Sequence, residues 1–197
     1  MKSLRIAIMA TVVAVVFGMP APVRAGEPIE QLSATIQEFV TILANTPVAQ
    51  LRATGLPDKA RQLVFTRFDF FEMTERSLGS HWRSLSPAEQ REFVEAFTQR
   101  LLVFYGRTVR SSSRETIHLA REIQDGKQAT VETKIVSGNG EELSIDYRLH
   151  EINGQWKVYD VLIDYVSLVK NYRAQFERVI AKSSLRDLLR RVKEQDS

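Results

Sequence analysis

The sequence of 197 residues contains no cysteine, so neither a disulfide nor a thiol nucleophile can be part of its fold or chemistry. It also lacks a G-x-S-x-G nucleophile elbow and a glycine-rich phosphate-binding loop. The three histidines, His81, His118 and His150, do not have the spacing of metal ligands. No proline follows Pro87, so none interrupts the strands or helices of the second half. These absences argue against the common catalytic sites and leave a chain that its apolar core must hold together.

The first 25 residues have the pattern of an export signal. Lys2 and Arg5 form a basic start, and Ile6–Gly18 is an apolar stretch. That stretch has 13 residues, fewer than the ~20 that span a bilayer. Val23-Arg24-Ala25 then places small residues where a signal peptidase needs them. We predict a signal peptide over residues 1–25, cleavage after Ala25 and a periplasmic location.

Removal of this segment changes the charge of the protein. The full chain has 27 basic and 24 acidic residues, and Lys2, Arg5 and Arg24 leave with the signal. The remaining residues, 26–197, carry 24 charges of each sign and no net charge. A nucleic-acid-binding domain needs a basic face, so we expect no nucleic-acid partner. We expect residues 26–197 to form a single domain.

Helical periodicity dominates the first half of the chain. We expect helices from Ile29 to near Pro47, after Pro57, over Phe70–Leu78 with an end at Gly79, and from Ser86 to about Ser111. The last of these is the best specified. Ser86-Pro87-Ala88-Glu89 supplies an N-cap, a proline in the first turn and the glutamate of a capping box.

The second half changes to the period of two that is typical of strands. The alternating residues are Ile117, Leu119 and Ile123, then Val131, Thr133 and Ile135, then Leu143, Ile145, Tyr147 and Leu149. Turn signals separate these runs at Asp125-Gly126, Gly138-Asn139-Gly140 and Asn153-Gly154. The pattern predicts an α+β fold: a four-stranded antiparallel meander with one buried face, packed on that face by several helices.

The segment Gly154–Phe176 contains an apolar strand that leads with almost no loop into an amphipathic helix. Ser167 is a suitable N-cap for that helix. In the strand, Trp156 and Val158 belong to one register and Val161 and Ile163 to the other, and a β-bulge near Asp160 would reconcile them. A strand that leads so tightly into a helix lays the helix against the sheet and builds one wall of a pocket. A last helix is expected near Leu185–Val192.

Two motifs in this chain resemble a known family. WKVYD followed by VSLVKNYRAQF is similar to the C-terminal signature of the MlaC and toluene-tolerance family of periplasmic lipid carriers. FDFFEMTERSLGSHWRSLSPAEQREFVEAF, Phe68–Phe97, resembles an upstream motif of the same family. The resemblance covers roughly residues 30–192. The chain departs from the family pattern at Tyr165, where glycine is expected, and at Ser183-Ser184, where Asp-Gly is common.

The resemblance implies a function as well as a fold. Proteins of this family hold the acyl chains of a phospholipid in an apolar cavity between helices and sheet. They work with an inner-membrane ABC transporter and an outer-membrane lipoprotein or porin complex that maintain lipid asymmetry. They need no cofactor, no metal and no covalent chemistry. The candidate cavity wall consists of Phe93, Phe97, Leu101 and Tyr105 facing Val131, Ile135, Ile145 and Tyr147, with Tyr172 and Phe176 closing the side.

Alternatives remain open from the sequence. The cargo can be a hopanoid or other terpenoid lipid, the apolar residues can form a filled core in a periplasmic adaptor, or a related cone-shaped fold can be an enzyme. Asp146, Asp160 and Asp164 are the only imaginable paired carboxylates, and Asp146 alternates with apolar neighbours and so should point outward. His118 and His150 should be solvated surface residues for the same reason.

Basic residues near the C-terminus are candidates for partner contacts. Lys170 and Arg173 flank Tyr172 near the expected mouth of the pocket and are placed to meet a phosphate, although a structural role beside nearby acids is favoured for Arg173. The last helix carries Arg186, Arg190, Arg191 and Lys193, which we interpret as a solvated face that also includes Asp187 and Glu194.

Overall fold

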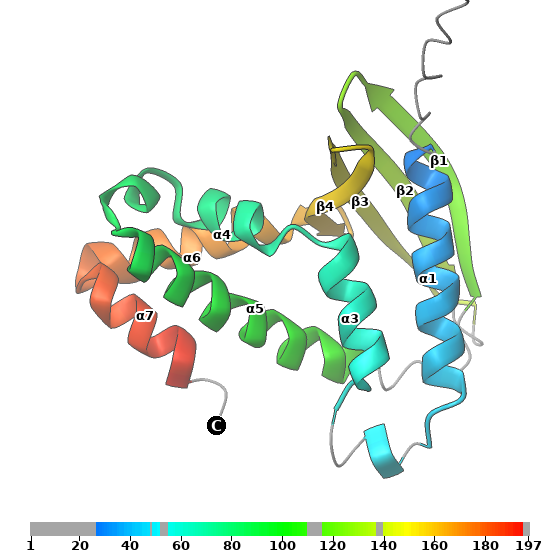
Figure 1. The fold of residues 1–197 in the computed structure, drawn as a ribbon, viewed down its shortest axis with the longest axis horizontal. Coiled ribbons are helices and arrows are strands. Elements are labelled where there is room, and N and C mark those ends of the chain that lie inside the picture. The colour runs from blue at the N-terminus through cyan, green and yellow to red at the C-terminus, as the bar shows by residue number, and fades with distance from the viewer. Residues whose placement is uncertain (1–26, 48, 52–54, 110–115, 137–139, 195–197) are drawn as a thin grey trace, which may run out of the picture.

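The computed structural model describes residues 27–47, 49–51, 55–109, 116–136 and 140–194 (Figure 1). The predicted signal peptide lies outside these residues, as do most of the predicted turn at Gly138-Asn139-Gly140 and the predicted helix end near Ser111. Helices precede strands along the chain, as the change of period indicated. The elements are α1 (Pro28–Ala44), α3 (Asp58–Arg67), α4 (Phe70–Leu78), the 3-10 helix η1 (Gly79–Ser84), α5 (Pro87–Val109), β1 (Thr116–Asp125), β2 (Gln128–Val136), β3 (Glu142–Ile152), β4 (Gln155–Ile163), β5 (Val166–Ser167), α6 (Leu168–Lys182) and α7 (Leu185–Glu194).

The strands form one antiparallel sheet in the order β1-β2-β3-β4-β5. This confirms the α+β class and the four-strand meander, and it adds β5, a two-residue strand on the far side of β4. The β3–β4 turn has positive φ at both central residues, Asn153 at 51° and Gly154 at 79°. That combination is the type I′ turn that an Asn-Gly pair favours.

A β-bulge in β4 re-aims its later side chains. Arg148 pairs with Asp160 and the next residue, Leu149, pairs with Val158, so Tyr159 is the extra residue. Because of this insertion, Trp156 and Val158 share a face with the residues that follow the bulge, Val161 and Ile163. The bulge predicted near Asp160 is confirmed, one residue earlier.

A second bulge, in β1, was not predicted. Leu119 pairs with Thr133 and Arg121 with Glu132, which leaves Ala120 as the extra residue. Ile123 is therefore turned away from the covered face and is 44% exposed, so the expected alternation was wrong at this residue. Glu122 takes the inward position, where its carboxylate accepts a hydrogen bond of 2.6 Å from the backbone N–H of Ile29 at the start of α1. A carboxylate is stabilising there, because the first N–H groups of a helix have no partner within it.

The helix ends follow the sequence signals. At α5, the hydroxyl of Ser86 accepts from the Glu89 N–H at 3.3 Å, and the Glu89 carboxylate accepts from the Ser86 N–H at 2.8 Å, which is the predicted capping box. At α6, the hydroxyl of Ser167 accepts from the Lys170 N–H at 3.1 Å, as expected of the N-cap. The helix Phe70–Leu78 has the predicted bounds and is capped by Asp69.

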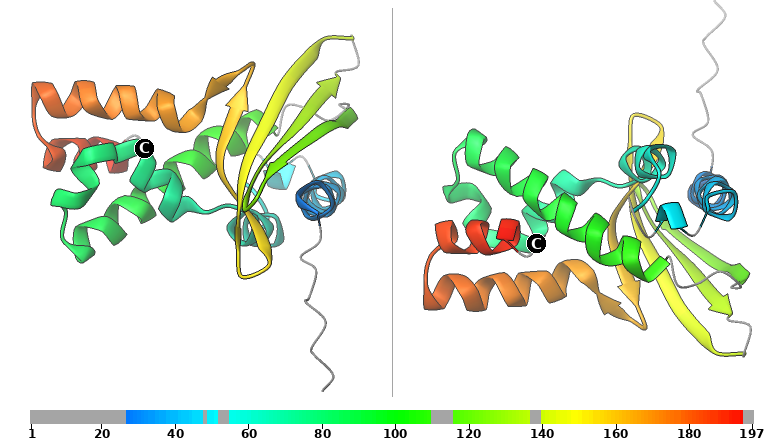
Figure 2. Two further views of the ribbon diagram at one scale, coloured as in Figure 1. Left: turned by 90° about the horizontal axis from the view of Figure 1, so that it is seen from above. Right: turned by 90° about the horizontal axis from the view of Figure 1, so that it is seen from below.

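The sheet stands between two groups of helices (Figure 2). α1 lies across one face, which we call the inner face, and α4, α5, α6 and α7 form a layer on the other side, beyond β4. Each group has its own apolar cluster. The sheet cluster contains Leu32 of α1 with Ala129, Val131, Leu149, Trp156, Val158, Val161 and Leu168. The helical cluster contains Phe70, Met73, Leu78, Trp82, Phe93, Ala96, Phe97, Leu101, Val169, Tyr172, Phe176, Leu188 and Val192. Phe68 packs against both clusters and so joins them.

Candidate functional site

Five of the predicted wall residues lie together in the helical cluster. Phe93, Phe97, Leu101, Tyr172 and Phe176 are all buried, with exposures of 1–6%. The ring of Phe97 lies edge-on to Tyr172 at 4.8 Å and to Phe176 at 5.4 Å between centroids. These distances are those of favourable aromatic pairs, so this side of α5 packs against α6.

The other wall residues lie on the sheet. Val131, Ile145 and Tyr147 belong to the sheet cluster or pack against it, and Ile135 lies on the same inner face of β2. The side chain of Tyr105 is outside the described residues. The structure places eight of the nine described side chains in or against two clusters, the five of α5 and α6 in the helical cluster and Val131, Ile145 and Tyr147 in or against the sheet cluster. The binding role of the ten residues stays a prediction.

The apolar side chains of the inner face become more exposed from one end of the sheet to the other, although the small polar residue Thr133, between Leu119 and Ile145, is 1% exposed. Near the β3–β4 turn, Leu149 and Val158 are fully buried at 0% and Ala129 is 5% exposed. At the opposite end, Ile135, Ile145 and Ile163 are only partly buried, and Leu119 is 37% exposed. We call these two regions the buried end (Ala129, Leu149 and Val158) and the open end (Leu119, Ile135, Ile145 and Ile163). An apolar sheet face that its own helices leave partly uncovered is available to an apolar ligand.

Apolar residues of the neighbouring helices show the same incomplete burial. On α1, Ile36 packs against the sheet cluster, but Val40, one turn later, is 46% exposed. On α3, Phe65 is 48% exposed although its ring contacts Phe70 at 5.6 Å. Phe104, near the C-terminal end of α5, is 59% exposed. Large apolar side chains are thus incompletely covered on three helices as well as at the open end.

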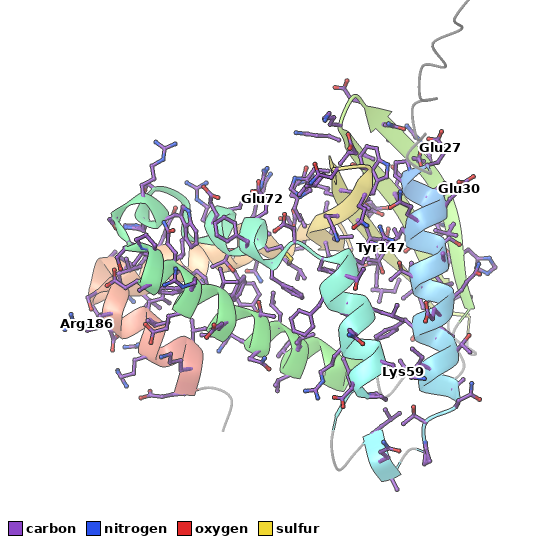
Figure 3. All side chains as sticks on the ribbon, in the orientation of Figure 1. Glu27, Glu30, Lys59, Glu72, Tyr147 and Arg186 are labelled. Atoms are coloured by element: carbon purple, nitrogen blue, oxygen red, sulfur yellow. The ribbon has the colours of Figure 1, made fainter. Side chains whose placement is uncertain are left out.

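Tyr147, labelled in Figure 3, lies at the boundary between the two ends, where it packs against the sheet cluster that includes Leu32 of α1. Its cross-strand neighbours on the inner face are Val131 and Val161. Burial raises the pKa of this phenol to about 12, because the surroundings disfavour the charged form. Its hydroxyl makes no hydrogen bond with any residue that the structure describes. It is a neutral polar group in a largely apolar environment.

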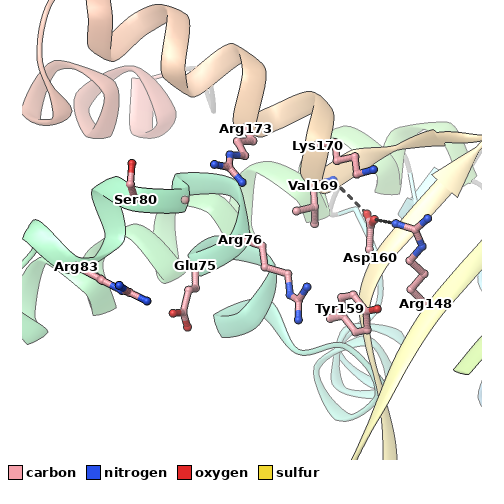
Figure 4. Close-up of a pocket in the computed structure, with 11 residues that line it drawn as sticks. Glu75, Arg76, Ser80, Arg83, Arg148, Tyr159, Asp160, Val169, Lys170 and Arg173 are labelled. Atoms are coloured by element: carbon pink, nitrogen blue, oxygen red, sulfur yellow. Dashed lines mark hydrogen bonds and ion pairs between the residues drawn. The ribbon is translucent and has the colours of Figure 1, made fainter. Parts of the chain in front are cut away.

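A separate pocket of about 750 Å³ lies on the outer face, where β3 and β4 meet α4, η1 and α6 (Figure 4). Its basic side chains come from four elements: Arg76, Arg83, Arg148, Lys170 and Arg173. Its acidic side chains are Glu75 and Asp160. We call it the cationic pocket. It contains Lys170 and Arg173, for which the sequence allowed a phosphate contact, and three arginines that the sequence did not connect with them.

Asp160 organises the joint between the sheet and α6. Its carboxylate accepts from the Ser167 hydroxyl at 2.7 Å, from the Val169 N–H at 3.1 Å and from Arg148 at 3.3 Å. At 3% exposure, this carboxylate is almost fully removed from solvent and is satisfied by these partners. The sequence suggested a carboxylate pair for Asp160, but the structure gives it the role of a second cap of α6.

Two further expectations about polar residues need correction. Asp146 lies on the outer face as predicted, but it is only 8% exposed. Burial, followed by the nearby charge of Glu132, raises the pKa of its carboxyl group. His150 also lies on the outer face, but it is not a solvated residue. Its ring lies 3.0 Å from the Asp69 carboxylate and 5.3 Å from the ring of Tyr159. His118 is exposed, as expected.

Three of the four basic residues named on α7, Arg190, Arg191 and Lys193, are engaged with acids, in agreement with the interpretation of a solvated face. Arg190 and Arg191 both pair with Asp187, and hydrogen bonds from Arg190, Ser183 and Arg191 lower the pKa of that carboxyl group to about 2. Arg190 also pairs with Glu194, and Lys193 pairs with Glu92 of α5. Within the described ranges, no group of histidine and carboxylate side chains is arranged to hold a metal ion. No described helix is both long and apolar enough to cross a bilayer.

The fold and the sequence both have known counterparts. A phospholipid-binding protein from Ralstonia solanacearum, solved in complex with a phospholipid, has the same fold, with a TM-score of 0.76 and 24% identity. The similarity covers 85% of this chain and 96% of that one. The profile of the MlaC protein family matches residues 33–194. The chain therefore belongs to the MlaC family, and the resemblance seen in the two motifs is confirmed.

Two characterised relatives are similar to shorter stretches. The toluene tolerance protein ttg2D of Pseudomonas putida is 32% identical over 95 residues, which are 48% of this chain and 44% of that protein. The intermembrane phospholipid transport system binding protein MlaC of Haemophilus influenzae is 22% identical over 125 residues, 61% of this chain and 58% of that protein. The matched stretches thus span about half the length of these relatives.

Proposed function

We propose that this protein is a periplasmic phospholipid carrier that holds acyl chains against the open end of the sheet. Membership of the MlaC family supports this assignment, as do a relative named for phospholipid transport and a protein of the same fold in complex with a phospholipid. We further propose export by the predicted N-terminal signal, no enzymatic activity, and lipid exchange with an inner-membrane ABC transporter and an outer-membrane lipoprotein or porin complex.

The observation that carries the proposal is the gradient of burial on the inner face. The residues of the open end are aliphatic. They lie on the same face of the sheet as the residues that form a closed core at the buried end. A folded domain gains free energy from burying such residues, at roughly 25 cal/mol for each Å² of apolar surface. Leaving them partly exposed forgoes that stabilisation unless a ligand covers them. Acyl chains are suitable ligands, because they need only apolar contact.

The energetics of lipid transfer explain why such a carrier is useful. Moving a two-chain lipid with ~30 methylenes into water costs about 0.8 kcal/mol for each methylene, or roughly 24 kcal/mol. A barrier of that size limits spontaneous escape to times of about a day or longer. Transfer from one apolar site to another removes most of this cost. The protein therefore needs an apolar binding surface and partners that dock beside it, and it needs no reactive group.

Native mass spectrometry of the purified protein, followed by solvent extraction, tests the proposal. We expect co-purified phospholipid in the wild type and its loss in Ile145→Trp, because a large side chain at the open end occupies the space of the acyl chains. Ile123→Trp is the matched control. It makes the same change on the outer face of the same sheet, at a residue that is 44% exposed, and should retain lipid.

Each outcome separates the alternatives. A bound terpenoid in place of phospholipid would favour a hopanoid-type carrier. Repeatedly empty wild-type protein would contradict the carrier function and favour an adaptor with a filled core. Circular dichroism of Ile145→Trp must show a folded protein. If it does and lipid is still bound, the acyl chains lie elsewhere.

A further inference from the structure

The cationic pocket gathers basic side chains in a protein whose numbers of basic and acidic residues, 27 and 24, are nearly equal. Five basic side chains line it, and three of them form ion pairs: Arg76 with Glu72, Arg148 with Asp160 and Arg173 with Glu177. Its basic groups come from α4, η1, β3 and α6, which are distant in sequence. Like charges repel when they are brought together, so this convergence costs stability unless an anion is bound.

These ion pairs leave two bases, Arg83 and Lys170, without a carboxylate partner in the described part of the chain. Asp160 is 3% exposed, and its oxygens are already occupied by Ser167, the Val169 N–H and Arg148. Glu75 forms no ion pair with any residue in the described part of the chain. The charges of Arg83 and Lys170 are therefore available to a ligand.

The other arginines of the pocket are held in place by contacts that use only some of their N–H donors, so the rest can bind a ligand. Arg76 pairs with Glu72 at 2.6 Å, and its guanidinium lies over the ring of Tyr159 at 4.4 Å from the centroid. Arg148 uses one nitrogen on Asp160, and a guanidinium has five N–H donors. Side chains fixed in this way lose little conformational entropy when a ligand binds.

Arg173 is held by Glu177, whose carboxylate accepts a hydrogen bond from its Nε at 3.0 Å, and it packs against a glycine. A Cβ atom built on Gly79 would lie 3.0 Å from three atoms of the Arg173 guanidinium, so the side chain packs directly on the bare backbone of this turn. Gly79 has φ of +56°, a conformation that other residues rarely adopt. The turn that ends α4 thus leaves space for Arg173 at the pocket, which Arg83 and Ser80 also line (Figure 4).

We propose that the cationic pocket binds a phosphate group, the chemistry shared by phospholipid headgroups and free phosphate. Guanidinium groups match phosphate oxygens with paired hydrogen bonds, and lysine adds a point charge. A single carboxylate of a protein partner would cancel one of the two charges of Arg83 and Lys170, whereas a phosphate with up to two negative charges can cancel both and offers more acceptor oxygens.

This site is distinct from the apolar surface of the proposed function. Arg148 and Asp160 alternate with the inner-face residues Tyr147, Leu149 and Val161, so the pocket lies on the opposite face of the sheet from the open end. Phosphate binding there does not depend on whether the protein carries acyl chains, and the two proposals can fail separately.

Titration of the full-length mature protein with inorganic phosphate, followed by NMR or calorimetry, tests the site. We expect saturable binding that weakens about tenfold in Lys170→Ala and in Arg83→Ala, because each loses a charge-assisted hydrogen bond. Lys182→Ala is the matched control, since it removes the same charge from an exposed position at the other end of α6. It should bind as the wild type does.

A second arm identifies the source of the phosphate. Co-flotation with vesicles of phosphatidylglycerol and of phosphatidylcholine measures headgroup binding. Lys170-dependent binding to the anionic vesicles would assign the site to a lipid headgroup, and binding of inorganic phosphate alone would assign it to free phosphate. No binding in either arm, or binding that Lys170→Ala and Arg83→Ala leave unchanged, would overturn the proposal. A protein that still co-purifies with lipid in that case would leave the carrier function intact.

Discussion

The buried end and the open end of the inner face are built from the same kinds of residue on the same strands, yet they differ in burial. Leu149 and Val158 are fully buried in one cluster with Leu32 of α1 and Trp156, whereas Ile145 and Ile163 keep access to solvent. The difference therefore arises from the covering elements and not from the sheet. One end provides the core that folds the domain, and the other provides a surface for a ligand. A carrier needs both, because a fully packed interior leaves no space and a fully open one is not stable.

The largest expected effect comes from truncating one side chain at each end and comparing the losses of stability. Leu149→Ala should lower the free energy of unfolding by about 2–5 kcal/mol, because it opens a cavity in a closed core. Ile163→Ala should cost only about 1 kcal/mol, since part of its side chain is already in solvent and the space remains open to it. Urea denaturation of the delipidated proteins measures both values. Equal losses would mean that the open end is as tightly packed as the buried end, and the case for acyl-chain binding there would fail.

Sequence periodicity revealed the elements of this fold but not how they meet. The bounds of Phe70–Leu78, the capping box at Ser86 and the bulge in β4 depend on neighbouring residues, so local signals sufficed to predict them. The bulge at Ala120 had no such signal, because alanine marks neither a turn nor a kink. It reversed the expected orientation of Ile123.

The candidate sites were harder to predict for the same reason. The apolar stripe of α5 was evident, but periodicity does not say whether Phe97 meets Tyr172 or Tyr147. The cationic pocket gathers Arg76, Arg148 and Lys170 from three elements far apart along the chain. No spacing rule connects such residues before the tertiary structure is known. Asp160 offered a weak signal, because its position beside the predicted bulge placed it at the joint with α6.

The turn between β4 and β5 offers a smaller test at the open end. Asp164 and Tyr165 both have positive φ, 45° and 66°, and the Tyr165 side chain is 78% exposed. A side chain in this conformation costs about 1 kcal/mol or more, which glycine avoids. Tyr165→Gly should therefore stabilise the protein by about 0.5–1 kcal/mol and raise its melting temperature by roughly 1–3 °C. Tyr165→Ala is the control, because it removes the ring without relieving the backbone and should give no gain. If both variants gain the same stability, the exposed ring of Tyr165 and not its backbone conformation destabilises the wild type.

The smallest expected effect concerns the outer face of the sheet. Asp146 lies on that face, between the inner-face residues Ile145 and Tyr147 along β3. Burial and the charge of Glu132 raise the pKa of its carboxyl group above the ordinary 3.8, so the folded protein holds this proton more tightly than the unfolded chain does. The protonated form is thus favoured by folding below that ordinary pKa, and this contribution is lost as the pH rises through the folded-state pKa. Asp146→Asn cannot ionise, so it should melt at a higher temperature than the wild type at pH 7 and at nearly the same temperature at about pH 3. Glu132→Gln should give part of the gain at pH 7, because it removes the repelling charge but leaves the burial. If the difference in melting temperature between Asp146→Asn and the wild type does not change with pH, packing and not the carboxylate charge distinguishes the variant. Burial of Asp146 would then carry no electrostatic cost.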